Sequence, residues 1–220
     1  MSSSPLFDSY QIRGLTLPNR VVMAPMTRSF SPGGVPGENV AEYYGRRGDA
    51  DVGLIITEGT TVNRGGASND PKVPNFHADD ALAGWSNVVD AVHKTPGKIA
   101  PQLWHVGMMR KPGTGPDPDA VSDSPSGRTH KGKQVQPEPS ENDVADMVMA
   151  YANAAGDAKR LGFDAIEIHG AHGYLIDEFF WNVMNTREDK YGGNLADRAT
   201  FAGEIIRECR KQVGGDMPII

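Results

Sequence analysis

The chain has 220 residues, of which 38% are hydrophobic and 23% are charged, a composition typical of an ordinary globular protein. Its formal net charge is −6 and its Lys and Arg residues are spread along the sequence, so a nucleic-acid surface is not expected. The single cysteine, Cys209, excludes an intramolecular disulfide and a multi-cysteine zinc or iron–sulfur site within these residues.

The N-terminal stretch MSSSPLFDSYQIRG lacks the basic region and apolar run of a signal peptide. No segment reaches the ~18 apolar residues that a membrane helix needs. The lone cysteine fits a reducing compartment. We therefore expect a cytoplasmic protein without a membrane partner.

Short apolar runs rich in Val and Ile predict buried strands along the chain. Continuous apolar character, rather than alternation, is typical of parallel strands that are covered on both faces. The predicted strands span 21–24, 52–57, 98–103, 165–169 and 218–220.

Apolar residues recur at helical spacing between these runs and predict helices over 39–47, 79–93, 142–161 and 195–213. The last is expected as one helix, whose buried stripe holds Leu195, Ala199, Ala202, Ile206, Cys209 and Val213. On that stripe Cys209 is interpreted as a small core residue.

Alternating strands and helices indicate an α/β fold with a parallel sheet. No GxGxxG follows a strand and no GxxxxGK[ST] occurs, which disfavours a dinucleotide-binding Rossmann unit and a P-loop. The sequence therefore predicts a (β/α)8 TIM barrel. Such a barrel needs eight strands and ~250 residues, so we expect about the first five strands here, residues 1–220 being the N-terminal part of one barrel.

Two irregularities are predicted within this barrel. Residues 107–142 hold six Pro and five Gly between a strand and a helix, on the side where barrels carry their active sites, and are expected to form a lid. Pro101 falls inside a central strand, where it removes a hydrogen bond of the ladder. We expect a local bulge beside Gln102.

Polar and aromatic residues follow the ends of four predicted strands. Because side chains alternate along a strand, Gln102 and Trp104 share a face. Polar groups beside an aromatic wall on the rim of an apolar barrel suit a flat ligand with polar edges. The strand-end residues are Pro25, Met26 and Thr27, then Glu58 and Gly59, then Gln102, Trp104 and His105, and finally His169, His172 and Tyr174.

Five blocks that carry these residues are similar in order and spacing to the Old Yellow Enzymes, a family of FMN-dependent ene-reductases on a (β/α)8 barrel. The blocks are NRVVMAPMTRS (19–29), GLIITEGT (53–60), GKIAPQLWHVG (97–107), GFDAIEIHGAHGYLIDEFF (162–180) and NTREDKYGGNLADR (185–198). They cover nearly the whole chain, and five blocks in one order are far more specific than any single one.

The resemblance implies a role for each matching position. Thr27 matches the residue that bonds the flavin C4 carbonyl, and Gln102 matches the one that holds the pyrimidine edge. Further cofactor contacts are implied for Pro25, Met26, Gly59 and His169. Trp104, His169 and His172 match substrate-binding residues, and Tyr174 matches the proton donor.

The implied reaction is NAD(P)H-dependent reduction of an activated C=C bond in a small enone or nitro-alkene. Two fixed donors stabilise a developing oxyanion without reorganising, and a phenol with a pKa near 10 stays protonated to supply the proton. FMN and NAD(P)H are the implied cofactors, no metal is implied, and assembly into a homo-oligomer is compatible with this expectation. In this family the FMN phosphate site lies beyond Ile220.

Other interpretations remain open at this point. His169 and His172 could ligate a metal, with Glu58, His105 or His77 completing the set. The chain could also be an inactive or assembly-dependent barrel fragment. His93 is expected at a helix C-terminus, His77 and His130 as solvated loop residues, and Arg187 with Asp189 as a brace for the active-site loop.

Overall fold

A four-stranded parallel sheet forms the centre of the computed structural model, which describes residues 4–220. The strands follow the order β3 (Val22–Met23), β4 (Leu54–Thr61), β5 (Lys98–Trp104) and β6 (Glu167–Ile168). Beyond β6, Ile219 makes a parallel bridge with Ile166, so the fifth predicted strand continues the sheet as a single bridge. Sequence neighbours are neighbours in space throughout, as in a (β/α)8 barrel.

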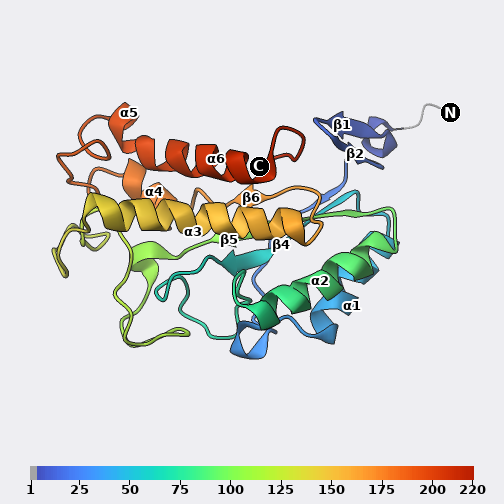
Figure 1. The fold of residues 1–220 in the computed structure, drawn as a ribbon, viewed down its shortest axis with the longest axis horizontal. Helices are drawn as coiled ribbons and strands as arrows, with labels where there is room; N and C mark the ends of the chain where they lie inside the picture. Colours follow the sequence, from blue (N-terminus) through green and yellow to red (C-terminus); the bar gives the residue numbers. More distant parts are fainter. Residues whose placement is uncertain (1–3) are drawn as a thin grey trace.

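Four long helices cover one face of this sheet (Figure 1). They are α1 (Glu38–Asp49), α2 (Asp79–His93), α3 (Glu141–Arg160) and α6 (Thr200–Val213). The helices pack in pairs, α1 with α2 and α3 with α6. Burial of apolar side chains from helices and strands between the two layers drives this arrangement. The largest fully buried side chains include Trp85, Tyr44, Tyr151 and Phe201. None of the described helices is long and apolar enough to cross a membrane.

An N-terminal hairpin, which the sequence analysis did not anticipate, covers the amino ends of the strands. After a 3-10 turn, η1 (Pro5–Phe7), strands β1 (Tyr10–Ile12) and β2 (Leu15–Leu17) pair in antiparallel fashion. Leu15 and Leu17 pack in one cluster with three residues from the sheet strands, namely Leu54, Ala100 and Ala165. This plug closes the end of the sheet opposite the predicted site.

The predicted helix over 195–213 is wrong in its continuity and in part of its buried stripe. It divides at Ala199, which ends the short helix α5 (Leu195–Arg198) and begins α6. Leu195 and Ile206 are exposed. The buried stripe is Phe201, Ile205, Cys209 and Val213, which repeat every four residues. Cys209 is in the core, as predicted, and burial raises the pKa of its thiol to about 12.

The predicted bulge lies in β4, opposite Pro101. Ile56 pairs with Ala100 and Gly59 with Gln102, so three steps along β4 match two along β5. The N–H of Gln102 donates to the hydroxyl Oγ1 of Thr57, 3.1 Å away, instead of to a backbone carbonyl. The extra residue is typical of strand ends that aim side chains into an active site.

Residues 107–140 connect β5 to α3 and pack tightly although they are irregular; we call them the excursion. The segment starts with a 3-10 turn, η3 (Gly107–Met109), where the buried Arg110 donates to the carbonyls of Ala120, Thr114 and Asp117. It ends at Ser140, whose side chain caps α3. Such internal hydrogen bonding explains why so long a loop can be ordered.

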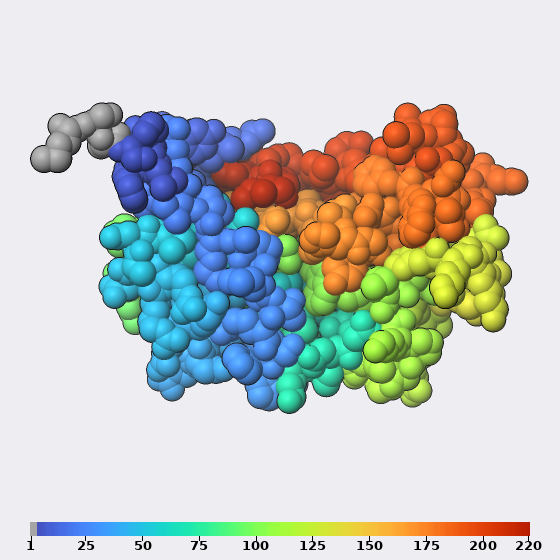
Figure 2. Space-filling model, turned by 180° about the vertical axis from the view of Figure 1, so that it is seen from behind, coloured from blue at the N-terminus to red at the C-terminus, as the bar shows by residue number. Residues whose placement is uncertain are grey.

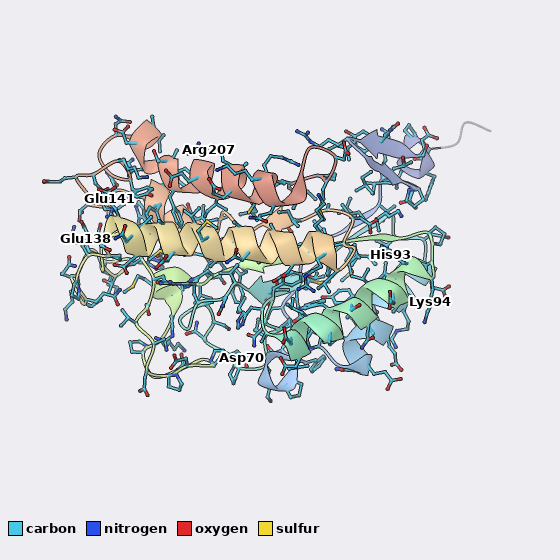
Figure 3. All side chains as sticks on the ribbon, viewed as in Figure 1. Asp70, His93, Lys94, Glu138, Glu141 and Arg207 are labelled. Carbon is cyan, nitrogen blue, oxygen red and sulfur yellow. The ribbon has the colours of Figure 1, made fainter. Side chains whose placement is uncertain are left out.

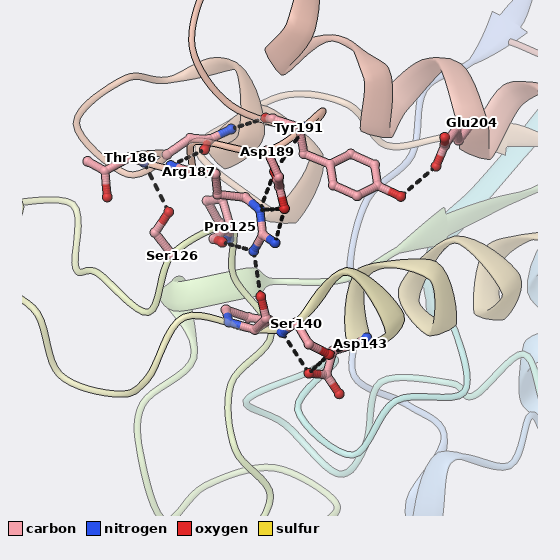
Figure 4. Close-up of polar contacts among 11 residues, drawn as sticks. Pro125, Ser126, Ser140, Asp143, Thr186, Arg187, Asp189, Tyr191 and Glu204 are labelled. Carbon is pink, nitrogen blue, oxygen red and sulfur yellow. Dashed lines mark hydrogen bonds and ion pairs between the residues drawn. The ribbon is translucent and has the colours of Figure 1, made fainter.

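Arg187 pins the far end of the excursion (Figure 4). Its guanidinium, 2% exposed, pairs with Asp189 and donates to the carbonyls of Pro125 and Pro139 at 2.8 and 2.7 Å. The N–H of Thr186 donates to the hydroxyl of Ser126 at 3.0 Å. The brace predicted for Arg187 and Asp189 therefore exists, and its immediate target is the excursion.

Figure 2 shows the molecule from behind. There the blue N-terminal residues, the green segments and the orange residues near 170 come to the surface side by side. These are the segments that carry the residues predicted to form the site.

Candidate functional site

His169, His172, Tyr174 and Trp104 form a cluster of aromatic rings at the carboxyl end of the sheet. The Nδ1 atom of His172 lies 3.3 Å from Nε2 of His169. The Tyr174 ring is 5.0 Å from the His169 ring and 5.4 Å from the Trp104 ring, both in edge-on geometry. Two strand ends thus bring together four of the predicted residues.

The loop from His169 to Tyr174 is shaped by unusual backbone angles. His172 has φ 63° and Gly173 has φ 71°, a left-handed conformation that is uncommon for a histidine. This pair of angles turns the chain back toward the strand end, and Tyr174 then starts the helix α4 (Leu175–Phe180) at its N-cap position. Strain of this kind is typical of functional loops.

The hydrogen bonds assign a tautomer to His169. The N–H of Ala171 donates to Nδ1 of His169 at 3.3 Å, so in the neutral ring the proton sits on Nε2. Burial, followed by the charge on His172, lowers the pKa of His169. The ring is therefore neutral near pH 7 and presents an N–H on the side of His172.

Gln102 and Gly59 lie side by side on paired positions of β5 and β4. The Gln102 amide is nearly buried and its Nε2 lies 3.4 Å from Oε2 of Glu167. Burial raises the pKa of Glu167. A Cβ atom on Gly59 would lie 2.9 Å from the Trp104 ring, so only glycine allows the strand to pass this close beneath the indole.

Pro25, Met26 and Thr27 follow the end of β3, and the last two are exposed. Thr27 lies beyond the end of β3 and Gln102 lies on β5, and β4 separates these two strands. Two strand spacings amount to roughly 10 Å. A group that reaches both must therefore be broad, which suits a flat ring system and excludes a single small ion.

Glu58 holds the segment after Thr27 in place. Its carboxylate, which is fully buried, accepts from the backbone N–H groups of Arg28 and Ser29 at 2.9 and 3.3 Å. The Arg28 guanidinium adds two more hydrogen bonds at 3.1 and 3.2 Å. Four donors satisfy one buried charge, as burial of a carboxylate requires.

Aromatic rings complete the surroundings of this ion pair. The guanidinium of Arg28 lies 3.7 Å from the centre of the Tyr43 ring, and that of Arg47 lies 3.5 Å from the same ring. The N–H of Glu58 donates to the Tyr44 hydroxyl at 2.8 Å. Burial, and then the Glu58 charge, raises the pKa of Tyr44. The phenol therefore stays protonated and rigidly placed.

His105 joins the strand end to the excursion. Its Nδ1 accepts from the N–H of Gly107 at 2.9 Å, so Nε2 donates to Asp123, also at 2.9 Å. Arg64 donates to both oxygens of Asp123 at 2.7 and 2.8 Å. Burial alone would raise the pKa of Asp123, but these hydrogen bonds outweigh it and lower the pKa.

The metal alternative finds no support in this geometry. Glu58 and His105, two of its proposed ligands, are engaged by Arg28 and Asp123. Among residues 4–220, no three His, Cys, Asp or Glu side chains are placed so that they could hold a metal ion.

The histidines outside the cluster differ partly from expectation. His93 is the last residue of α2 (Figure 3), as predicted, and its Nε2 lies 2.8 Å from Oδ2 of Asp164. His77 and His130 were predicted to be solvated, yet His77 is half-buried and burial lowers its pKa. His130 pairs with Glu178 at 3.2 Å.

Glu58 was predicted only as a possible metal ligand, and no role was predicted for Glu178 or Asp123. Glu58 and Glu178 could have been recognised, because an acidic residue that follows a predicted buried strand or falls on the inner side of a helix must have partners. Asp123 lies in an irregular segment, where spacing carries no such information.

Several observations indicate that the site can hold a flat cofactor. The Trp104 Nε1 is buried without a partner beside Gly59, and the exposed Thr27 and the Gln102 amide offer hydrogen-bonding groups to a ring. A parallel barrel sheet with this constellation at its carboxyl end defines the class of flavin-binding barrel proteins.

Comparison with known proteins agrees with this class. The family model described as NADH:flavin oxidoreductase / NADH oxidase matches residues 5–220. A 12-oxophytodienoate reductase 7 from Oryza sativa subsp. japonica is 40% identical over 97% of this chain, and a flavin oxidoreductase hxnT from Emericella nidulans is 37% identical over 96%. The chain belongs to the NADH:flavin oxidoreductase / NADH oxidase family, which confirms the resemblance to the Old Yellow Enzymes.

Solved structures give the same result. Morphinone reductase in complex with tetrahydroNAD superposes with a TM-score of 0.87 at 35% identity, over 99% of this chain and 63% of that one. The chain also spans 57% of the length of each of the two curated relatives. The described half-barrel thus corresponds to only part of the length of these relatives.

Proposed function

We propose that this chain forms the N-terminal part of an FMN-dependent oxidoreductase that uses NAD(P)H to reduce activated C=C bonds. The observation that carries the proposal is the His169–His172–Tyr174 cluster beside the Gln102–Gly59–Trp104 edge. The relatives named as reductases, and the neighbour bound to tetrahydroNAD, support the same assignment.

The residues that would hold FMN lie on three strand ends. Thr27 would donate to the C4 carbonyl of the ring and Gln102 would bond its pyrimidine edge, while Pro25, Met26 and Gly59 would line it by shape. His169 would reach both ring and substrate. When bound, FMN would take up hydride from NAD(P)H and deliver it to the β-carbon of an enone or nitro-alkene.

The chain's own residues would supply the polar part of the reaction. The N–H groups of His169 and His172 would bind the carbonyl or nitro oxygen, on which negative charge builds up, and donors fixed in this way need no reorganisation. Tyr174 would give its phenolic proton to the α-carbon. Trp104 would form the wall against which the substrate lies. Residues 107–142 would close over the site as a lid.

Anaerobic half-reactions test the proposal. With FMN bound, NAD(P)H should bleach the flavin absorbance, and an enone such as cyclohexenone should then restore it. Conversion of both His169 and His172 to Ala should weaken the binding of phenols and enones. Absence of flavin reoxidation by any enone or nitro-alkene, in protein that NAD(P)H does reduce, would contradict the C=C reductase assignment.

A second candidate is an assembly-dependent barrel fragment, which one observation favours. A hollow of about 730 Å³ lies between β6 and α6, lined by apolar residues that include Ile168, Ile206 and Ile220 and by the basic residues Arg13, Arg207, Arg210 and Lys211. Ile206 and Ile220 are half exposed. Light scattering on the 220-residue polypeptide distinguishes the candidates, since a fragment of this kind should appear only as a multimer and bind no FMN.

A further inference from the structure

We propose that His130 and Glu178 are a positioning pair through which the excursion fixes the loop that carries His169, His172 and Tyr174. The inference deepens the proposed function, on which its catalytic consequence rests. It assigns a role to a buried carboxylate and a half-buried imidazole that the reaction itself does not use.

Glu178 stands one helical turn after Tyr174. Its N–H donates to the carbonyl of Tyr174 at 2.9 Å, and its side chain is fully buried. Any shift of the Glu178 carboxylate therefore moves the first turn of α4, and with it the residue at the N-cap position. This is the route by which a contact at Glu178 reaches the phenol.

Two distant parts of the excursion meet on one oxygen of this carboxylate. Oε1 accepts from the N–H of Met108 at 2.7 Å and lies 3.2 Å from Nε2 of His130. Met108 belongs to the turn that starts the excursion, and His130 lies between Arg128 and Gln134, which bridge in antiparallel fashion. The start and the middle of the excursion are thus tied to α4 at one point.

His130 also lies next to the loop that carries His169, His172 and Tyr174. A Cβ atom built on Gly173 would lie 3.7 Å from Cε1 of His130, so the imidazole occupies the space beside the residue before Tyr174. The ring further packs against Trp181, 5.7 Å between centroids. Its position over Gly173, whose φ is 71°, limits the freedom of the most permissive residue in the loop.

The second oxygen of Glu178 is also held in a tightly packed position. Oε2 is buried without a hydrogen-bond partner, and a Cβ atom on Gly107 would lie 2.5 Å from it. The carboxylate is packed directly against the backbone of Gly107. A carboxylate buried in this way depends on its cationic neighbour, because an uncompensated buried charge is strongly unfavourable.

The charges around the pair make it sensitive to pH. The titratable groups nearby are Asp177 on α4 and His105 at the end of β5. Hydrogen bonding to Glu178 raises the pKa of His130, and burial raises that of Glu178. A raised pKa means that the folded pair holds its proton more tightly than separated groups do. The stabilisation from His130 is therefore complete below the ordinary histidine pKa of about 6.5 and is lost as the pH rises through its raised value.

The test compares His130→Ala and His130→Gln with His77→Ala, a control at a half-buried histidine of another loop. Amide hydrogen exchange at Met108 and Gly173 should be roughly tenfold faster in His130→Ala and unchanged in the control. With FMN bound, alkene reduction should slow by about tenfold while reduction by NAD(P)H stays within about twofold. His130→Gln, which keeps a donor but does not titrate, should restore exchange protection and abolish the decline of alkene reduction above about pH 6.5.

The outcomes separate the two proposals. Exchange at Met108 and Gly173 that is the same in His130→Ala and in the control would overturn the positioning pair, whatever the activity. A wild-type protein that reduces no alkene would overturn the proposed function, while the exchange measurement still decides whether the pair orders the loop.

Discussion

Tyr174 gives the sharpest prediction at the scale of single residues. Its ring stands between Trp104 and the two imidazoles, where a proton donor to the substrate would be. Replacement by Phe keeps this packing and removes only the proton. We expect flavin reduction by NAD(P)H to be nearly unchanged and alkene reduction to slow by about 10²-fold or more, the typical loss of a general acid. Stopped-flow measurement of both half-reactions checks this, and equal loss in both would refute the assigned role.

Glu58 is predicted to matter for cofactor binding without touching the cofactor. Glu58→Gln leaves Arg28, whose side chain is 11% exposed, without its counter-charge. Loss of one partner of a buried pair typically costs about 3 kcal/mol of folding free energy or more. We expect lower stability in urea and weaker FMN binding, because the segment after Thr27 loses its anchor. The exposed Glu42→Gln on α1 is the matched control, and similar behaviour of both variants would contradict this role.

The lowered pKa of His169 predicts that the stability of the fold depends on pH. Burial, and then the neighbouring His172, lowers its pKa, so the unfolded chain binds the proton more readily than the folded one. The contribution of the neutral ring is complete above about pH 6.5 and is lost as the pH falls toward the lowered value. The difference in unfolding free energy between the wild type and His169→Asn should therefore shrink between about pH 7.5 and about pH 5. A difference that grows on acidification would show that the ring is not desolvated.

At the scale of elements, the excursion depends on Arg187. Arg187→Lys keeps the charge but loses the planar fork that reaches Asp189, Pro125 and Pro139 together. We expect a loss of about 2 kcal/mol and faster proteolysis within residues 107–140. Arg207→Lys, at a side chain that is 62% exposed and projects from α6 (Figure 3), is the control. If both variants resist protease equally, Arg187 does not hold the excursion.

The predicted elements show where sequence reasoning succeeds. Buried parallel strands and α1, α2 and α3 follow from continuous apolar runs and helical spacing, which are local properties. The break at Ala199 and the exposure of Ile206 do not follow, since an apolar face reveals neither which neighbour covers it nor whether any does. The N-terminal hairpin was missed because Tyr10–Ile12 and Leu15–Leu17 are too short to form a pattern.

The candidate site, too, could be predicted from the sequence only in part. Strand ends and the loop around His172 could be located from sequence, since position on a barrel strand determines position on the rim. The contacts that hold the site, such as Glu58 with Arg28 or Asp123 with Arg64, join residues 30 and 59 positions apart. Their pairing depends on the tertiary fold, and spacing in the sequence carries no information about it.

The whole molecule is a half-barrel with one covered and one open face. Helices pack on one side, the N-terminal hairpin closes one end of the strands, and polar and aromatic groups gather at the other end (Figures 1 and 2). The distribution of roles follows: the covered face and plug provide stability, while the carboxyl ends and the excursion are available for chemistry.

The central claim is that a flavin ring lies across the rim between Thr27 and Gln102. Titration of the flavin-free protein with FMN, followed by quenching of flavin fluorescence, measures this most directly. The account predicts saturation at one FMN per chain, with binding weakened by Thr27→Ala and by Gln102→Ala and unaffected by His77→Ala. Binding that is absent in the wild type, or that is equally tight in all four proteins, would contradict it.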